Sequence, residues 1–216
     1  MNTMLRSKLV SDKIKEHYSN LFKQHGRDHV SVQYSSKESQ INRFEILLDV
    51  ADSMTSISDM GCGLADILPL VRERFGDIPY HGYDFVEDFI HSAKDQYDAD
   101  QNASFYTFDV NKDNTSIETD YVVLSGMLNN KMEDNAAFTE NTLNAMWRTC
   151  KKGIAFNALS TYVDYQDTHL HYHDPLSLFD YCKRNLSPYV TLRHDYDVKS
   201  HSIPFEFTIY AYKQGF

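Results

Sequence analysis

The sequence predicts an α/β protein, a three-layer α/β/α sandwich around a seven-stranded mixed sheet. Three observations predict it. Short apolar runs of strand length alternate with longer segments whose apolar residues recur at helical spacing. The first run leads through a glycine turn, 61–63, into a segment with helical spacing. The last two runs, 189–196 and 205–212, follow each other without a helix, which predicts an antiparallel C-terminal hairpin on a Rossmann-like sheet.

The chain begins with two predicted helices and a polar loop. Residues 7–22 have amphipathic spacing, and residues 25–36 are polar. The second helix is predicted to start at Ser39, whose hydroxyl suits an N-cap, and to run to Val50.

Strands and helices are then predicted to alternate. The expected strand segments are 56–60, 78–84, 104–108, 120–129 and 153–159. Residues 135–150 form a long helix with Leu143 and Met146 turned inward. Pro175 occupies a favoured first-turn position of the last helix.

Composition limits the size and the partners of the protein. The chain of 216 residues suffices for one α/β domain with a full core. The formal net charge of −10 and the scattered basic residues argue against nucleic acid as a partner. Three cysteines without a C-x-x-C pair, and no apolar run of signal or membrane-spanning length, indicate a cytoplasmic protein that binds no membrane. The oligomeric state stays open.

The glycine turn is expected to hold a ligand. Gly61 and Gly63 leave no side chain in the way, so backbone N–H groups could approach a ligand closely. A dinucleotide fingerprint would need glycine or alanine where Asp66 stands. The tighter spacing, with Asp59 two residues ahead, favours a nucleoside whose charged part is an amino acid.

Polar residues follow the next strands in order. Asp84 ends the second strand, where a carboxylate accepts hydrogen bonds from a ribose diol or, alternatively, caps the next helix. Asp109 ends the third strand and could accept from an adenine amine or only start a turn. The fourth run ends in small and polar residues, 125–129, near the expected reactive centre.

Together these elements resemble the class I S-adenosylmethionine-dependent methyltransferases. The matching segments are 59–65, 83–84, 108–110 and 120–129, and the resemblance extends from residue 36 to the C-terminus. It implies S-adenosyl-L-methionine as cofactor and S-adenosyl-L-homocysteine as product. The expected cofactor-binding residues are Asp59, Gly61, Cys62, Gly63, Asp84, Phe85, Asp109, Val110, Ser125, Gly126, Tyr34 and Arg43. Ala65 replaces the usual third glycine, which is tolerated if its φ is negative.

The resemblance also implies how the chain is organised. We expect a single methyltransferase domain, 1–216, with residues 1–50 as a helical cap over the active site. Residues 51–216 form the cofactor-binding core, with a polar lid at 160–174. In the cap, Arg43 and Tyr34 could bind the methionine carboxylate or an anionic substrate, whereas a solvated helix face is the alternative for Arg43.

Three residues are candidates for catalysis. Methyl transfer needs alignment in a site shielded from water, and an alcohol acceptor also needs a base. His194 and His171 are the candidate bases, although a strand-end histidine such as His194 could instead bond to the backbone. Asn129, or Asn157, could hydrogen-bond the acceptor or simply form a turn.

The alternating histidines 169, 171 and 173 raise the question of a metal. Their spacing suits zinc, but zinc sites normally recruit ligands from separated segments. We therefore expect a polar lid and no metal.

The expected reaction is methyl transfer to an oxygen or nitrogen atom of a small polar metabolite. Residues 125–129 lack the Asn/Asp-Pro-Pro-Tyr/Phe motif of amide-methylating enzymes, which argues against adenine or glutamine as acceptor. The alternative is a non-catalytic subunit or cofactor-sensing partner that keeps the nucleoside pocket.

Overall fold

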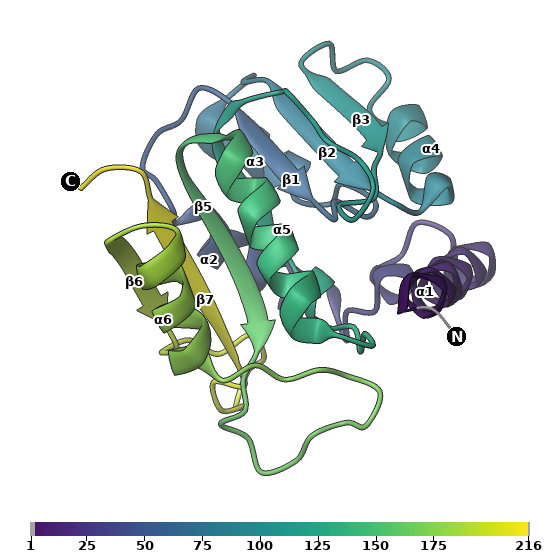
Figure 1. The fold of residues 1–216 in the computed structure, drawn as a ribbon. Helices are drawn as coiled ribbons and strands as arrows, with labels where there is room; N and C mark the ends of the chain where they lie inside the picture. The colour runs from purple at the N-terminus through teal and green to yellow at the C-terminus, as the bar shows by residue number, and fades with distance from the viewer. Residues whose placement is uncertain (1–2, 216) are drawn as a thin grey trace.

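A seven-stranded sheet in the order β3-β2-β1-β4-β5-β7-β6 forms the centre of the fold (Figure 1). The structure, a computed structural model, describes residues 3–215, with side chains from residue 12 onward. The strands are β1 Ile57–Met60, β2 Tyr80–Asp84, β3 Ala103–Thr107, β4 Thr119–Leu124, β5 Cys150–Leu159, β6 Tyr189–Arg193 and β7 Glu206–Tyr212. β7 is antiparallel to both of its neighbours, and the other strand pairs are parallel. The predicted mixed sheet with a terminal hairpin is confirmed.

Helices cover both faces of this sheet. They are α1 Thr3–His25, η1 His29–Val32, α2 Lys37–Leu48, α3 Leu68–Phe75, α4 Glu87–Gln96, η2 Met127–Asn129, α5 Asn135–Thr149 and α6 Pro175–Asn185. α2, α3 and α4 share one hydrophobic core with Val123, whereas α5 and α6 share another with Val122. Because neighbouring residues of a strand point to opposite faces, one buried strand serves both cores. None of the described helices is long and apolar enough to cross a membrane.

Local capping sets where two of the helices begin. Ser36 caps α2, because its hydroxyl accepts from the N–H of Ser39 at 3.1 Å. The predicted start at Ser39 is therefore three residues too late. Asp174 caps α6 by accepting from the N–H groups of Leu176 and Ser177, and Pro175 occupies the first turn as predicted.

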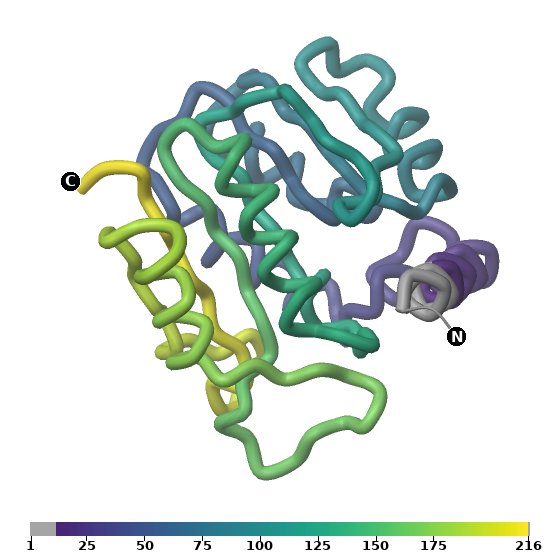
Figure 2. Tube along the Cα trace, in the orientation of Figure 1, coloured from purple at the N-terminus to yellow at the C-terminus, as the bar shows by residue number. Residues whose placement is uncertain are grey.

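The N-terminal segments lie over the edge where the parallel strands end. α1 packs beside α4 through Tyr18 and Phe22, whose rings meet Phe89 edge-on at centroid distances of 6.0 and 5.8 Å. The segment between β5 and α6 extends as a long loop beyond the carboxyl end of β5 (Figure 2).

A buried ion pair joins α2 to the sheet. The Nε of Arg43 donates to Oε2 of Glu206, the first residue of β7, at 2.7 Å. The side chains are only 9% and 1% exposed, so Arg43 does not lie on a solvated helix face. Arg43 also donates through Nη1 to the backbone oxygen of Ser39 at 3.0 Å. These bonds fix the register of α2 against the C-terminal hairpin.

We expect Arg43→Met to lower the free energy of unfolding by about 3–5 kcal/mol, because it leaves the Glu206 carboxylate buried without its partner. The double variant Arg43→Met/Glu206→Met removes that charge and should recover most of the loss. Urea unfolding of the three proteins measures both effects. A double variant as unstable as the single one would contradict this account.

Candidate functional site

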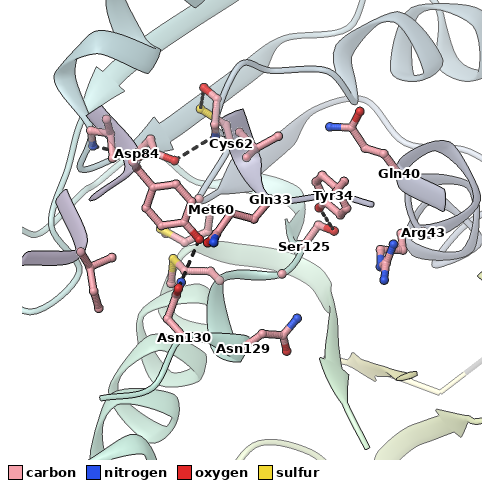
Figure 3. Close-up of a pocket in the computed structure, with 18 of the residues that line it drawn as sticks. Gln33, Tyr34, Gln40, Arg43, Met60, Cys62, Asp84, Ser125, Asn129 and Asn130 are labelled. Carbon is pink, nitrogen blue, oxygen red and sulfur yellow. Dashed lines mark hydrogen bonds between the residues drawn. The ribbon is translucent and has the colours of Figure 1, made fainter. Parts of the chain in front are cut away.

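A cavity of about 460 Å³ lies at the carboxyl edge of the parallel strands (Figure 3). Open α/β sheets bind ligands at this edge, and cavities of roughly 300–1,000 Å³ hold small molecules. Its walls come from distant parts of the chain. The N-terminal segments contribute Tyr18 and Tyr34, and the loop after β5 contributes Tyr165 and Tyr172. The cavity is therefore enclosed only when these segments fold onto the sheet.

The glycine turn after β1 is bonded to the end of β2. The N–H groups of Gly61 and Cys62 donate to the carbonyl oxygen of Tyr83 at 2.7 and 3.0 Å. The N–H of Gly63 donates to Oδ2 of Asp84 at 2.9 Å. These three donors point to β2, so the expectation that they approach a ligand is wrong. A phosphate would find none of them free.

The turn continues into an alanine with left-handed backbone. The φ angles of Gly61, Gly63 and Ala65 are 75°, 53° and 58°, so the expectation of a negative φ at Ala65 is wrong. This conformation costs an L-residue about 1–2 kcal/mol and interrupts helical geometry. α3 accordingly begins at Leu68, although apolar spacing predicted helix from Leu64. At Gly63 a Cβ would lie only 2.9 Å from Cγ1 of Val32, so a side chain there would force Val32 to shift.

Two buried carboxylates lie under the cavity. Oδ1 of Asp84 accepts from the N–H of Val86 at 2.8 Å, while Oδ2 accepts from Gly63. Burial raises the pKa of Asp84 to about 6 despite these bonds. Burial likewise raises the pKa of Asp59 to about 7, although the Tyr80 hydroxyl donates to its Oδ2 at 2.7 Å. Both carboxyl groups therefore exchange their protons near neutral pH, and a cation bound beside them would favour their charged forms.

The side of the cavity next to β3 carries the residues expected at the adenine. The segment expected there, Phe108, Asp109 and Val110, lines the cavity, and so does Phe85, which follows β2. The carboxylate of Asp109 also makes a local turn, accepting from the N–H of Asn111 at 3.0 Å and from Nζ of Lys112 at 2.6 Å. Asp109 thus starts a turn, as one prediction had it, and also lines the cavity, as adenine binding would require.

The loop after β4, which contains Ser125 and Gly126, is hydrogen-bonded both to β5 and to the N-terminal segments. Oδ1 of Asn157 accepts from the N–H of Gly126 at 2.8 Å, so this side chain supports the loop and does not line the cavity. Ser125 Oγ lies 2.8 Å from the Tyr34 hydroxyl, and both residues line the cavity. Asn129 lines it too and accepts through Oδ1 from the N–H of Leu159 at 2.9 Å, which leaves its amide nitrogen to donate.

Cys62 lines the cavity as a buried thiol beside Gly82. Its Sγ donates weakly to the carbonyl oxygen of Gly63 at 3.8 Å. Burial raises the pKa of this thiol well above its usual range, so it acts as a small filler and not as a nucleophile.

Neither predicted base lines the cavity. His194 lies beyond β6, where Nε2 is 3.0 Å from the carbonyl oxygen of Pro204. His171 packs edge-on against the ring of His173 at a centroid distance of 4.4 Å. Strand periodicity does not hold in the lid, which is irregular around His171, and His194 lies outside the lid in the irregular segment after β6. The described lining residues include no histidine.

The lid closes on itself at its two ends. The N–H of Thr161 donates to the carbonyl oxygen of His173 at 2.9 Å, and the N–H of His173 donates to that of Leu159 at 2.8 Å. The Nε2 of His173 also faces the carbonyl oxygen of Leu128 at 3.2 Å, and burial lowers its pKa to about 4. Across the described residues no three His, Cys, Asp or Glu side chains gather in a way that could hold a metal.

Gln40, Lys199 and Phe205 are among the polar and aromatic residues of the cavity that were not predicted as site residues. Gln40 is 1% exposed, and its Nε2 donates to Asp66 Oδ2 at 3.0 Å, so its Oε1 is oriented away and has no partner among the described residues. Gln40 stands one helical turn before Arg43, a spacing that could have indicated it. Lys199 and Phe205 come from the loop between β6 and β7, where no motif marks them.

Comparison with known proteins adds independent information. The sequence matches no protein-family model. It is 32% identical over 173 residues to the Mycobacterium tuberculosis protein named "Putative methyltransferase Rv1506c", covering 77% of this chain and 98% of that protein. Magnesium protoporphyrin IX methyltransferase (ChlM) from Synechocystis PCC 6803, solved with bound SAH, has a TM-score of 0.62 at 12% identity, with 98% of this chain and 99% of that chain covered.

A second solved structure has a similar fold. Haemonchus contortus phosphoethanolamine N-methyltransferase 1, in complex with phosphoethanolamine and S-adenosylhomocysteine, has a TM-score of 0.68 at 15% identity. The match covers 97% of this chain and 49% of that chain. At such low identities the likeness establishes the fold alone.

The buried Asp59 gives the protein a measurable pH dependence. Its pKa of about 7 in the folded chain exceeds the value of about 4 in an unfolded chain. The folded state therefore binds the extra proton between these values, and this stabilisation is lost as pH rises through 7. Asn at this position cannot titrate and still accepts from Tyr80. In urea unfolding, Asp59→Asn should gain stability relative to wild type when the pH is raised from about 5 to about 8. An unchanged difference would contradict this.

Proposed function

Because this chain belongs to the class I S-adenosylmethionine-dependent methyltransferases, we propose that it methylates a nitrogen or oxygen atom of a small polar metabolite. Its cofactor is S-adenosyl-L-methionine, which supplies a methyl group on a sulfonium whose leaving group is a neutral thioether. The observation that carries the proposal is the pair formed by the glycine turn and the Asp84 carboxylate, which the N–H of Gly63 joins directly.

The residues present fit this cofactor. Each oxygen of the Asp84 carboxylate accepts one backbone N–H, and a carboxylate oxygen has a second lone pair for one hydroxyl of the ribose. Oε1 of Gln40 is a buried acceptor with no partner in the part of the chain that the structure describes, which suits the ammonium of the methionine end. Asp59, Asp84 and Asp109 line this part of the cavity, and a bound sulfonium would favour the charged forms of Asp59 and Asp84, whose pKa values are raised.

The remaining walls are proposed to align the acceptor and exclude water. The described part of residues 1–50 serves as the cap and residues 160–174 as the lid, supported by the tyrosines that both contribute to the cavity. The amide nitrogen of Asn129 is available to hydrogen-bond the acceptor. Since no histidine is among the described lining residues, an amine or carboxylate that already carries a reactive lone pair suits the site better than an alcohol.

The same proposal places the reaction in the cytoplasm without nucleic acid as partner. Cys62, Cys150 and Cys182 are all buried free thiols, which supports a reducing compartment. The net charge of −10 argues against a polyanionic substrate.

Titration calorimetry and a labelled-methyl assay test the proposal together. Wild type should bind S-adenosylhomocysteine and should transfer label from S-adenosylmethionine to a product in a metabolite extract. Asp84→Ala should weaken S-adenosylhomocysteine binding by about ten- to hundredfold, because charge-assisted hydrogen bonds to the ribose are lost. Asp52→Ala, an exposed carboxylate outside the cavity, is the matched control. Absence of binding would reject the proposal, and binding without transfer would favour the non-catalytic alternative.

Gln40→Met tests the methionine end separately. It should raise the dissociation constant of S-adenosylhomocysteine by about tenfold while leaving that of 5′-methylthioadenosine, which lacks the amino-acid part, unchanged. Gln24→Met on the exposed side of α1 is the control. Equal weakening of both ligands would show that Gln40 acts on the fold of the site and not on the ammonium.

A further inference from the structure

The charged residues of the cavity are segregated along the sheet. Among the described residues, four carboxylates line the cavity: Asp59 in β1, Asp66 in the segment between β1 and α3, Asp84 at the end of β2 and Asp109 shortly after β3. The cations Arg43 and Lys199 line the cavity with Phe205, which directly precedes β7. β7 lies three strand positions from β1, and strand spacing makes this about 14 Å. The cavity therefore has a negative end beside β1, β2 and β3, and a positive end beside β7.

At the positive end, the two cations differ in how they are neutralised. Arg43 is paired with Glu206 at 2.7 Å. Lys199 makes no ion pair with any of the described side chains, and its Nζ stands 5.6 Å from the centroid of the Phe205 ring. The guanidinium of Arg43 lies near the same ring, at 5.9 Å, so Phe205 is flanked by two positive charges. In a chain of net charge −10, an unneutralised lysine at a cavity is an attractive site for an anion.

The loop that carries Lys199 is tied to the helix that carries Arg43. Asn42 Nδ2 donates to the carbonyl oxygen of Val198 at 3.4 Å, and the Ser200 hydroxyl donates to Glu38 at 3.2 Å. The hydroxyl of Ser202 donates to the carbonyl oxygen of Lys199 at 2.9 Å and closes the turn. These bonds hold the Lys199 backbone at the cavity wall while its side chain stays accessible.

We propose that the methyl acceptor carries an anionic group, a carboxylate or a phosphate monoester, and that Lys199 binds this group beside the Phe205 ring. The inference rests on the proposed function, since it names the acceptor class of the same site. Arg43 adds positive charge to this wall of the cavity, while the ammonium of Lys199 supplies the hydrogen-bond donors. The acceptor is thereby oriented with its anion over β7 and its remaining part toward β4 and β1.

The methionine carboxylate is a less suitable partner for Lys199. The amino-acid end of the cofactor belongs beside the glycine turn and Gln40, at the β1 side of the cavity. Phe205 and Lys199 stand across β4 and β5 from that turn. Because Lys199 lies beside Phe205, it does not compete with the cofactor's sulfonium for Asp59 and Asp84.

Matched aromatic probes test the proposal on the full-length protein saturated with S-adenosylhomocysteine. Benzoate and phenyl phosphate carry the two anionic groups, and benzamide is the neutral counterpart. We expect at least one anion to bind about tenfold more tightly than benzamide in calorimetry, and the tighter one identifies the acceptor group. Lys199→Met should remove that preference and leave S-adenosylhomocysteine affinity unchanged. Lys151→Met, exposed at the start of β5 on the opposite edge of the sheet, should preserve both.

Each other outcome overturns the inference in a recognisable way. Equal binding of anions and benzamide, or no binding of any probe, shows that no anion site exists. An anion preference that survives Lys199→Met shows that another residue forms it. Weaker S-adenosylhomocysteine binding by Lys199→Met assigns the lysine to the cofactor. Failure of wild type to bind S-adenosylhomocysteine rejects the proposed function instead, because that titration does not depend on the probes.

Discussion

The hydrogen bonds between the glycine turn and the end of β2 determine the geometry of the whole site. They join the backbone of Gly61, Cys62 and Gly63 to Tyr83 and Asp84. Because β1 and β2 are adjacent parallel strands, the turn and the carboxylate emerge at the same edge and fix each other. The turn has positive φ values at Gly61 and Gly63, and Val32 of η1 packs closely against Gly63. Displacing one end would displace the other.

The fold was predictable because its determinants are local. Alternation of apolar residues in 205–212 and helical spacing in 135–150 depend only on neighbouring residues, and the structure has β7 and α5 there. The residues after strands were likewise predictable as a group, since parallel strands end at one edge. Asp84, Asp109, Ser125 and Asn129 all line one cavity.

Other features depend on contacts between distant residues, and the sequence could not reveal them. Arg43 finds its partner 163 residues away, which no helical periodicity encodes. His171 and His194 had suitable chemistry and plausible positions, but irregular backbone turned one ring toward His173 and the other toward Pro204. Ala65 adopts a positive φ in a turn closed by its own N–H to the carbonyl oxygen of Cys62, so a rule based on residue type alone failed. Lys199 became a candidate site residue only because the fold places it at the cavity beside Phe205.

The segment between β5 and α6 is closed at its neck, although Leu170 and His171 within it also pair with Asn130 and Asn129 after β4. Thr161 and His173 pair across the neck, so the chain leaves and re-enters the core at nearly the same point. The residues between them that make no such pairing can be exchanged, or changed in number, without moving β5 or the first turn of α6. Evolution could thus change which acceptor enters the cavity through substitutions in this segment alone, while selection acts separately on the sheet and the cofactor site.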